Sequence, residues 1–104
     1  MAGVDVCNAA TAASTPLFPL GSLYATPGAI EALSEAGQEA SEFLRRHQYG
    51  DWGDLSDDDK AENDFSVSRS LRIFSAYHTK EGVKLWVITE ADRSATTVLL
   101  PSDY

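Results

Sequence analysis

The sequence has little cysteine, few basic residues and no long apolar run, and each shortage excludes a class of protein. Its single cysteine, Cys7, allows neither an intramolecular disulfide nor a cysteine-rich zinc site, so a reducing, cytoplasmic setting is expected. No apolar run approaches the roughly 20 residues that cross a bilayer, which argues against a membrane span. Met1 to Ala13 contains no lysine or arginine, so a secretory signal is not expected either.

Acidic residues dominate the charge. The chain has 16 Asp and Glu against 8 Lys and Arg, for a formal charge of -8. Because binding to a nucleic-acid backbone depends on basic side chains that displace counterions, direct binding to nucleic acid is disfavoured. A length of 104 residues suits one domain, and 43% hydrophobic residues are ordinary for a globular protein. We therefore expect a flexible leader over residues 1–15 and a single domain over residues 16–104.

The order of the local signals predicts helices followed by strands. Thr26 and Pro27 are typical of a helix start, and Ser56 is a good N-cap for an acidic first turn. From Leu71 onwards the apolar period changes to two, which is typical of strands. The predicted elements are an edge strand at Gly21–Ala25, helices at Pro27–Ala36, Glu39–Gln48 and Asp57–Val67, and strands at Leu71–Thr79, Val83–Glu90 and Ala95–Pro101. The predicted fold is α+β, with the N-terminal helices packed on one face of a C-terminal, three- to four-stranded antiparallel sheet.

An acidic run occupies the middle of the chain. Its members are Asp51, Asp54, Asp57, Asp58, Asp59, Glu62 and Asp64, opposed only by Lys60. The favoured interpretation is a capped, hydrated helix face, since acidic residues are stabilised in a first helical turn. The alternatives are a site for a hard divalent cation or a mimic of nucleic-acid phosphates for a basic partner. A calcium-binding loop is excluded, because glycine and glutamate are missing from the required positions.

A second charged group, Glu90, Asp92 and Arg93, lies in one predicted hairpin. Such a trio could carry out acid and base chemistry or bind a phosphate if burial shifted its pKa values. The favoured interpretation is a solvated turn in which Asp92 and Ser94 bind local amides and Arg93 makes a surface ion pair.

Two tryptophans are candidate contact residues. Trp86 points away from Val83, Leu85 and Val87 on the same strand, so it is either covered by part of the N-terminal segment or exposed as a contact patch. Trp52 stands between two glycines. The strand at Ala95–Pro101 also offers a sheet edge through which a homodimer could form.

Nucleophilic catalysis has little support. Cys7 lies in the predicted leader, where no base could be held against it. His47 takes a core-facing position and is interpreted as a packed, hydrogen-bonded residue, while His78 ends a strand. The sequence contains none of the motifs Gly-x-Ser-x-Gly, Gly-x-Gly-x-x-Gly or His-x-x-x-His. No cofactor is expected.

Several motifs in the chain carry a resemblance to a known family. They are Pro16-Leu-Phe-Pro-Leu-Gly21, Ala25-Thr-Pro-Gly-Ala29, Gly50-Asp-Trp-Gly53, Ser75-Ala-Tyr77, Trp86-Val-Ile-Thr-Glu-Ala-Asp-Arg-Ser94 and Thr96-Thr-Val-Leu-Leu-Pro101. Over Pro16 to Tyr104 the chain resembles small, uncharacterised bacterial proteins carried on plasmids and integrated elements, labelled plasmid-related. The resemblance implies a role on a mobile element, where inhibitors of host defence such as anti-restriction or anti-CRISPR proteins are frequent.

These observations lead to two functional hypotheses. The first is a non-enzymatic, protein-binding module, and the second is a small metal-dependent hydrolase or nuclease that uses clustered carboxylates. The second requires acids from the middle of the chain and from the hairpin to converge within a few ångströms. The candidate binding residues are Trp52, Asp57, Asp58, Asp59, Trp86, Glu90, Asp92 and Arg93.

Overall fold

The structure is a computed structural model that describes residues 15–104. The predicted leader therefore lies, except for Thr15, outside the described residues, as does Cys7. The elements are β1 (Ser22–Ala25), α1 (Pro27–Ala36), α2 (Ala40–Gln48), α3 (Asp57–Arg69), β2 (Ile73–His78), β3 (Lys84–Thr89), β4 (Ala95–Leu99) and a short 3-10 turn, η1 (Pro101–Asp103). Every predicted helix and strand is present, with boundaries that differ by at most two residues.

The capping signals in the sequence work as predicted. The hydroxyl of Thr26 accepts a hydrogen bond from the Ala29 amide at 3.2 Å, and Pro27 follows at the first helical position. Gly37 ends α1 in the left-handed conformation, with φ of 66°. The Ser56 hydroxyl accepts from the Asp59 amide at 3.2 Å and starts α3. These local bonds explain why the helix boundaries could be predicted without tertiary information.

The sheet is mixed rather than antiparallel, which corrects the predicted fold class. Its strand order is β1-β4-β3-β2. The last three strands form the predicted antiparallel meander, whereas β1 pairs in parallel with β4. Short turns fix the direction of neighbouring strands, but the long helical connection after β1 leaves its direction to be decided by tertiary packing. Because β4 lies between β1 and β3, it is not an edge strand, so Ala95–Pro101 does not offer the free edge through which a homodimer could have formed.

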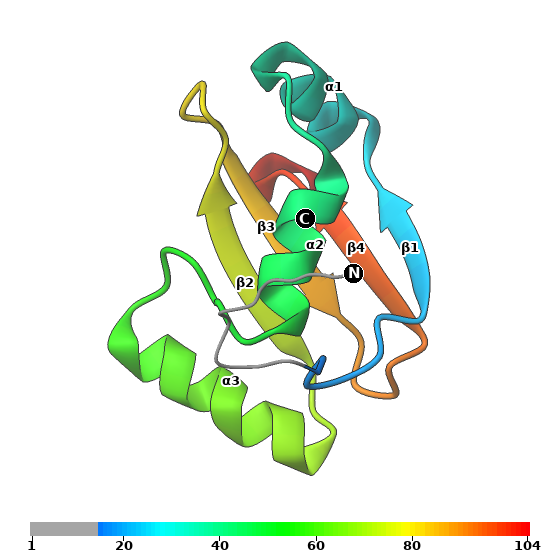
Figure 1. The fold of residues 1–104 in the computed structure, drawn as a ribbon, viewed down its shortest axis with the longest axis vertical. Coiled ribbons are helices and arrows are strands. Elements are labelled where there is room, and N and C mark those ends of the chain that lie inside the picture. Colours follow the sequence, from blue (N-terminus) through cyan, green and yellow to red (C-terminus); the bar gives the residue numbers. More distant parts are fainter. Residues whose placement is uncertain (1–14) are drawn as a thin grey trace, which may run out of the picture.

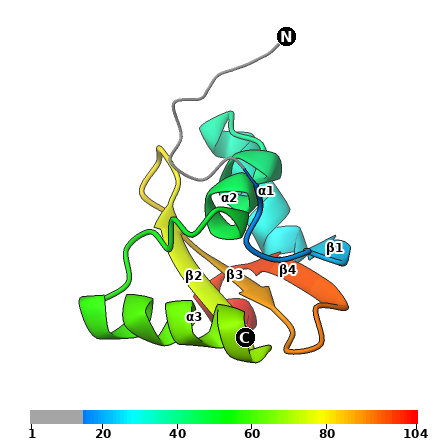
Figure 2. The same ribbon diagram turned by 60° about the horizontal axis from the view of Figure 1, so that its bottom comes forward.

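The helices take two positions around the sheet. α1 and α2 lie over one face, while α3 runs beside β2 at the edge (Figures 1 and 2). The expectation that all three helices share one face therefore holds for α1 and α2 only. The core between those helices and the sheet consists of Ala29, Leu33, Phe43, Leu44, Tyr77, Leu85, Val87 and Val98.

The opposite face of the sheet is covered by the C-terminus of the chain. Trp86 projects there, and its ring makes edge-to-face contacts with Phe74, at 5.0 Å between centroids, and with Tyr104, at 5.8 Å. Within residues 15–104, the C-terminal residues thus account for the apolar second face of β3, and they leave Trp86 half-buried.

Candidate functional site

The first candidate site is the acidic face of α3, which we define as Asp57, Asp58, Asp59 and Glu62. All four side chains are exposed. None of them forms an ion pair within residues 15–104, where the ion pairs are Arg46 with Asp51, Arg72 with Glu90 and His78 with Asp54. The acidic face is therefore charged, hydrated and not neutralised by the part of the chain that the structure describes.

Two hydrogen-bonded contacts fix the position of α3. Asn63 lies on its buried side, where its amide donates to the Phe74 carbonyl at 2.5 Å and accepts from the Phe74 amide at 3.2 Å. This side chain takes the place of a neighbouring strand at the edge of β2. At the other end of the helix, the guanidinium of Arg93 donates to the Ser66 carbonyl at 3.1 Å. The acidic face is thus presented on a helix that these two contacts help to anchor.

The guanidinium of Arg93 is surrounded by backbone carbonyl groups rather than by an anion. Its Nη1 donates to the carbonyls of Leu71, Ala91 and Glu90 at 2.7, 3.1 and 3.2 Å. Together with the bond to Ser66, these contacts cap the C-terminal end of α3 and tie it to the hairpin. Arg93 itself has φ of 61°, a left-handed conformation that is uncommon outside glycine.

The remaining hairpin acids behave as the turn interpretation predicts. The Asp92 carboxylate accepts from the Ser94 amide at 3.0 Å, and the Ser94 hydroxyl and amide lower the pKa of Asp92. Glu90 pairs with Arg72 at 3.5 Å, and both side chains are about half exposed. An exposed pair of this kind contributes little stability. The predicted ion pair of the hairpin therefore forms through Glu90, not through Arg93.

Trp52 lies inside the protein. Its side chain is 3% exposed, its Nε1 donates to Asp64 at 3.0 Å, and its ring stacks near Phe18 at 6.3 Å. The chain at Gly53, with φ of 75°, passes so close to β2 that a side chain there would collide with the Ala76 carbonyl. In this fold the Trp52 ring contributes to packing and is not accessible to a partner.

The carboxylates are not gathered into a metal site. Within residues 15–104 there is no group of three or more His, Cys, Asp or Glu side chains placed to hold a metal ion. The convergence that the hydrolase or nuclease hypothesis requires is thus not found in that part of the chain.

The most closely connected polar group is a buried network around His47. One ring nitrogen, Nδ1, contacts the Ser75 hydroxyl. The other, Nε2, lies 2.9 Å from the Thr89 hydroxyl, which in turn lies 2.7 Å from the Thr96 hydroxyl. Thr96 donates to the Leu20 carbonyl at 2.7 Å. All four side chains of the network are completely buried.

The carbonyl at the end of this network determines the position of each proton. Because Thr96 donates to Leu20, Thr89 must donate to Thr96, and His47 must then donate from Nε2 to Thr89. Its Nδ1 is left as an acceptor for the Ser75 hydroxyl. The ring is therefore neutral, and burial, aided by the positive charge of Arg93, lowers the pKa of His47 to about 3.

The network confirms that His47 is a packed, hydrogen-bonded residue, but its hydroxyl partners were not predicted. Ser75 and Thr89 come from different strands. The period-two pattern of a strand shows which side chains point inward, but not which inward hydroxyl groups contact the same histidine. Asn63 was missed as well. Its signal is a polar, weakly helix-forming residue at the centre of α3, where a core helix would carry an apolar side chain.

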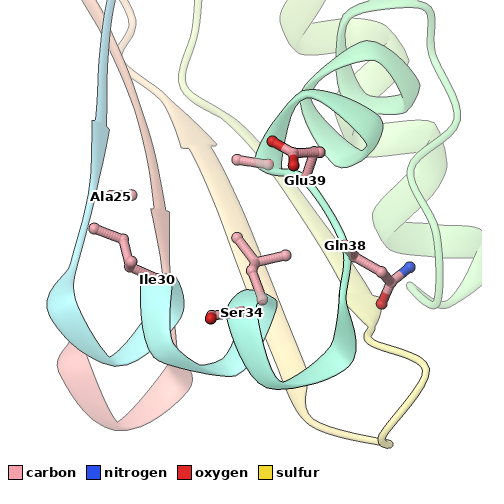
Figure 3. A pocket seen from close by; sticks show the side chains of 7 residues that line it. Ala25, Ile30, Ser34, Gln38 and Glu39 are labelled. Atoms are coloured by element: carbon pink, nitrogen blue, oxygen red, sulfur yellow. The ribbon is translucent and has the colours of Figure 1, made fainter.

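A surface pocket of about 320 Å³ lies between α1, the start of α2 and the end of β1. Figure 3 shows Ile30 and Ala25 on one side of the pocket and Glu39 on the other. Gln38 turns away from it, since its side chain binds the Lys80 amide and Glu42. Leu33, Ser34 and Ala40 complete the lining. No local pattern in the sequence predicts this pocket, because its walls come from three separate elements.

Comparison with protein-family models, with curated proteins and with solved structures finds no match for this chain. Among residues 15–104, no helix combines the length and the apolar character needed to cross a membrane.

Proposed function

We propose that this chain is a non-enzymatic protein-binding module of a mobile element, and that the acidic face of α3 binds a basic surface on a partner protein. The observation that carries the proposal is the exposure of Asp57, Asp58, Asp59 and Glu62 without an ion pair in the described chain. Four unneutralised carboxylates on one anchored helix form a negative field that attracts a cationic surface.

The anchoring of α3 supports a role for its acidic face in binding a partner, beyond keeping the protein in solution. Asn63 and Arg93 fix the helix against β2 and the hairpin, so the carboxylates keep their spacing before a partner arrives. A preorganised surface loses less conformational entropy on binding. A nucleic-acid-binding protein is the class of partner that fits, because its basic surface already accepts regularly spaced negative charges. This class includes the restriction and CRISPR proteins that the family resemblance implies.

The test is capture of partner proteins from bacterial cells by the tagged full-length chain, compared with the double variant Asp58→Asn, Glu62→Gln. We expect a basic protein to be retained at about 0.1 M salt and released at 0.5 M, because screening weakens contacts between exposed charges. The variant should retain at least tenfold less of it. The retained protein should also lose affinity for DNA when the wild-type chain is added.

The matched control is Glu31→Gln, Glu35→Gln, which removes two exposed acids from α1 and gives the same net charge. It should retain the partner as the wild type does. Equal loss in both variants would mean that net charge, not the acidic face, is responsible, and the proposal would fail. Retention of no basic protein by the wild type would contradict it as well.

A further inference from the structure

The outer edge of β1 is open in the described structure. β1 ends the strand order next to β4, and the amides of Ser22 and Thr26 donate to the carbonyls of Ser94, just before β4, and Val98, within it, at 2.9 and 3.0 Å. Backbone groups alternate in direction along a strand, so Leu23 and Ala25 point their N–H and C=O groups away from β4. No residue in 15–104 outside the sheet pairs with these groups.

The other edge of the sheet is closed, which makes the open edge of β1 a distinct feature. At β2, Asn63 occupies both backbone groups of Phe74. The next outward pair, on Ala76, is bound by the Trp52 carbonyl at 3.3 Å and the Asp54 amide at 2.7 Å. Proteins normally block such edges because free backbone groups pair with other chains. This fold blocks one edge and leaves the other available.

The open edge is also apolar. Leu23 is 56% exposed and Tyr24 59%, and Ile30, which lines the neighbouring pocket together with Ala25, is 55% exposed. The strand sequence Ser-Leu-Tyr-Ala contains no lysine or proline, the residues that commonly protect an edge. Pro19 and Pro27 stand before and after it, so pairing is limited to a short segment.

The pocket beside this edge has the chemistry of a site for a lysine or arginine side chain. Ala25 belongs both to the open edge and to the pocket, and with Ile30 and Leu33 it gives an apolar wall. Glu39 lies at the rim, caps no helix amide and forms no ion pair within residues 15–104. An apolar wall that ends at a carboxylate suits a long basic side chain, whose stem is apolar and whose head is charged.

We propose that β1 binds an extended, basic segment of a partner protein as an added strand. The segment pairs its backbone with Leu23 and Ala25 and extends a lysine or arginine side chain past Ala25 into the pocket, where the charged head meets Glu39. A second copy of this chain is the less suitable occupant, because each copy carries a formal charge of -8. This inference concerns a different surface from the acidic face of α3 and does not depend on it.

The probe is a synthetic peptide of alternating valine and lysine, blocked at both ends, added to the isotope-labelled full-length chain and followed by NMR. We expect peptide binding to slow hydrogen exchange at the amides of Leu23 and Ala25. Replacement Glu39→Gln should weaken binding about fivefold, the upper range for one partly exposed ion pair. The matched control Glu35→Gln, on an exposed acid of α1 that does not line the pocket, should change it by less than about twofold.

A second variant tests the backbone pairing. Leu23→Pro removes an outward N–H that β4 does not use, so peptide binding should be lost while the β4 amide signals persist; if that variant unfolds, the Glu39→Gln comparison decides. The variant Asp58→Asn, Glu62→Gln should bind the peptide as the wild type does, which separates this site from α3.

Several outcomes would overturn the inference. They are unchanged Leu23 and Ala25 amides at millimolar peptide, equal binding of a peptide with glutamate in place of lysine, and equal weakening by Glu35→Gln. Sedimentation that shows a dimer abolished by Leu23→Pro would assign the edge to a second copy instead. A change in those two amides on removal of residues 1–14 would assign it to this chain's own N-terminal segment.

Discussion

His47 shows how one buried residue connects the two layers of the protein. It comes from α2, yet its ring nitrogens contact Ser75 on β2 and Thr89 on β3. A neutral imidazole with one donor and one acceptor satisfies both hydroxyls, whereas a protonated ring would have two donors and would leave Ser75 without its acceptor. Protonation of His47 would therefore remove the acceptor that the Ser75 hydroxyl uses in the contact between α2 and the sheet.

The protonation of His47 predicts a loss of stability in mild acid. Its pKa is about 3 in the folded protein and near 6.5 when unfolded, so between these values the unfolded chain binds the extra proton. The stability that depends on neutral His47 is complete above about pH 6.5 and falls as the pH is lowered. Chemical denaturation should show the free energy of unfolding decrease by roughly 1.5 kcal/mol between pH 6.5 and 5.0 from this residue.

The control for the pH prediction is removal of the buried imidazole. His47→Gln should lose most of the pH dependence that the wild type shows between pH 6.5 and 5.0. A titration of the His47 ring signals in the folded wild type gives an independent measurement, and proton uptake above pH 5 would contradict the prediction.

At the scale of the element, α3 differs from α1 and α2 in how it attaches to the sheet. Its buried residues are Asn63 and Ser66, both polar. It is held by hydrogen bonds to the edge of β2 and to Arg93 more than by an apolar stripe. This explains why the sequence predicted the existence and start of α3 correctly but placed it on the wrong part of the sheet.

Asn63→Ala should destabilise the protein by about 1 to 3 kcal/mol, because it leaves the amide and carbonyl of Phe74 without their partners. Removal of this side chain also opens the edge of β2, so the variant should self-associate at concentrations where the wild type is monodisperse. Chemical denaturation and sedimentation measure the two effects.

The comparison for Asn63 is its exposed neighbour on the same helix. Glu62→Ala should change the free energy of unfolding by no more than about 0.5 kcal/mol. If both substitutions cost the same, helix propensity rather than the bond to β2 would account for the effect of Asn63.

For the whole molecule, the charge of -8 is the dominant property. Carboxylates without ion pairs repel one another most strongly in the compact state, and added salt screens that repulsion. We expect the midpoint of thermal unfolding to rise by about 2 to 5 °C between 20 mM and 500 mM NaCl. The rise should be smaller in Asp58→Asn, Glu62→Gln and larger in Arg45→Gln, which removes an exposed positive charge. A midpoint that falls with salt would show that the ion pairs outweigh the repulsion.

The sequence alone determined the local elements, since caps, turns and apolar periods act within a few residues. Ser56, Thr26 and Gly37 start or end their helices through bonds to near neighbours, and the meander follows from its short turns. It also predicted a hydrated helix face, and Asp57, Asp58, Asp59 and Glu62 are indeed exposed.

Only the tertiary structure decided which distant residues meet. The parallel pairing of β1 with β4, the closed edge of β2 and the open edge of β1 each join segments separated by long connections. The same holds for the hydroxyls around His47 and for the pocket with Glu39. Contacts of this kind depend on how the layers pack as a whole, and no local pattern in the chain encodes them.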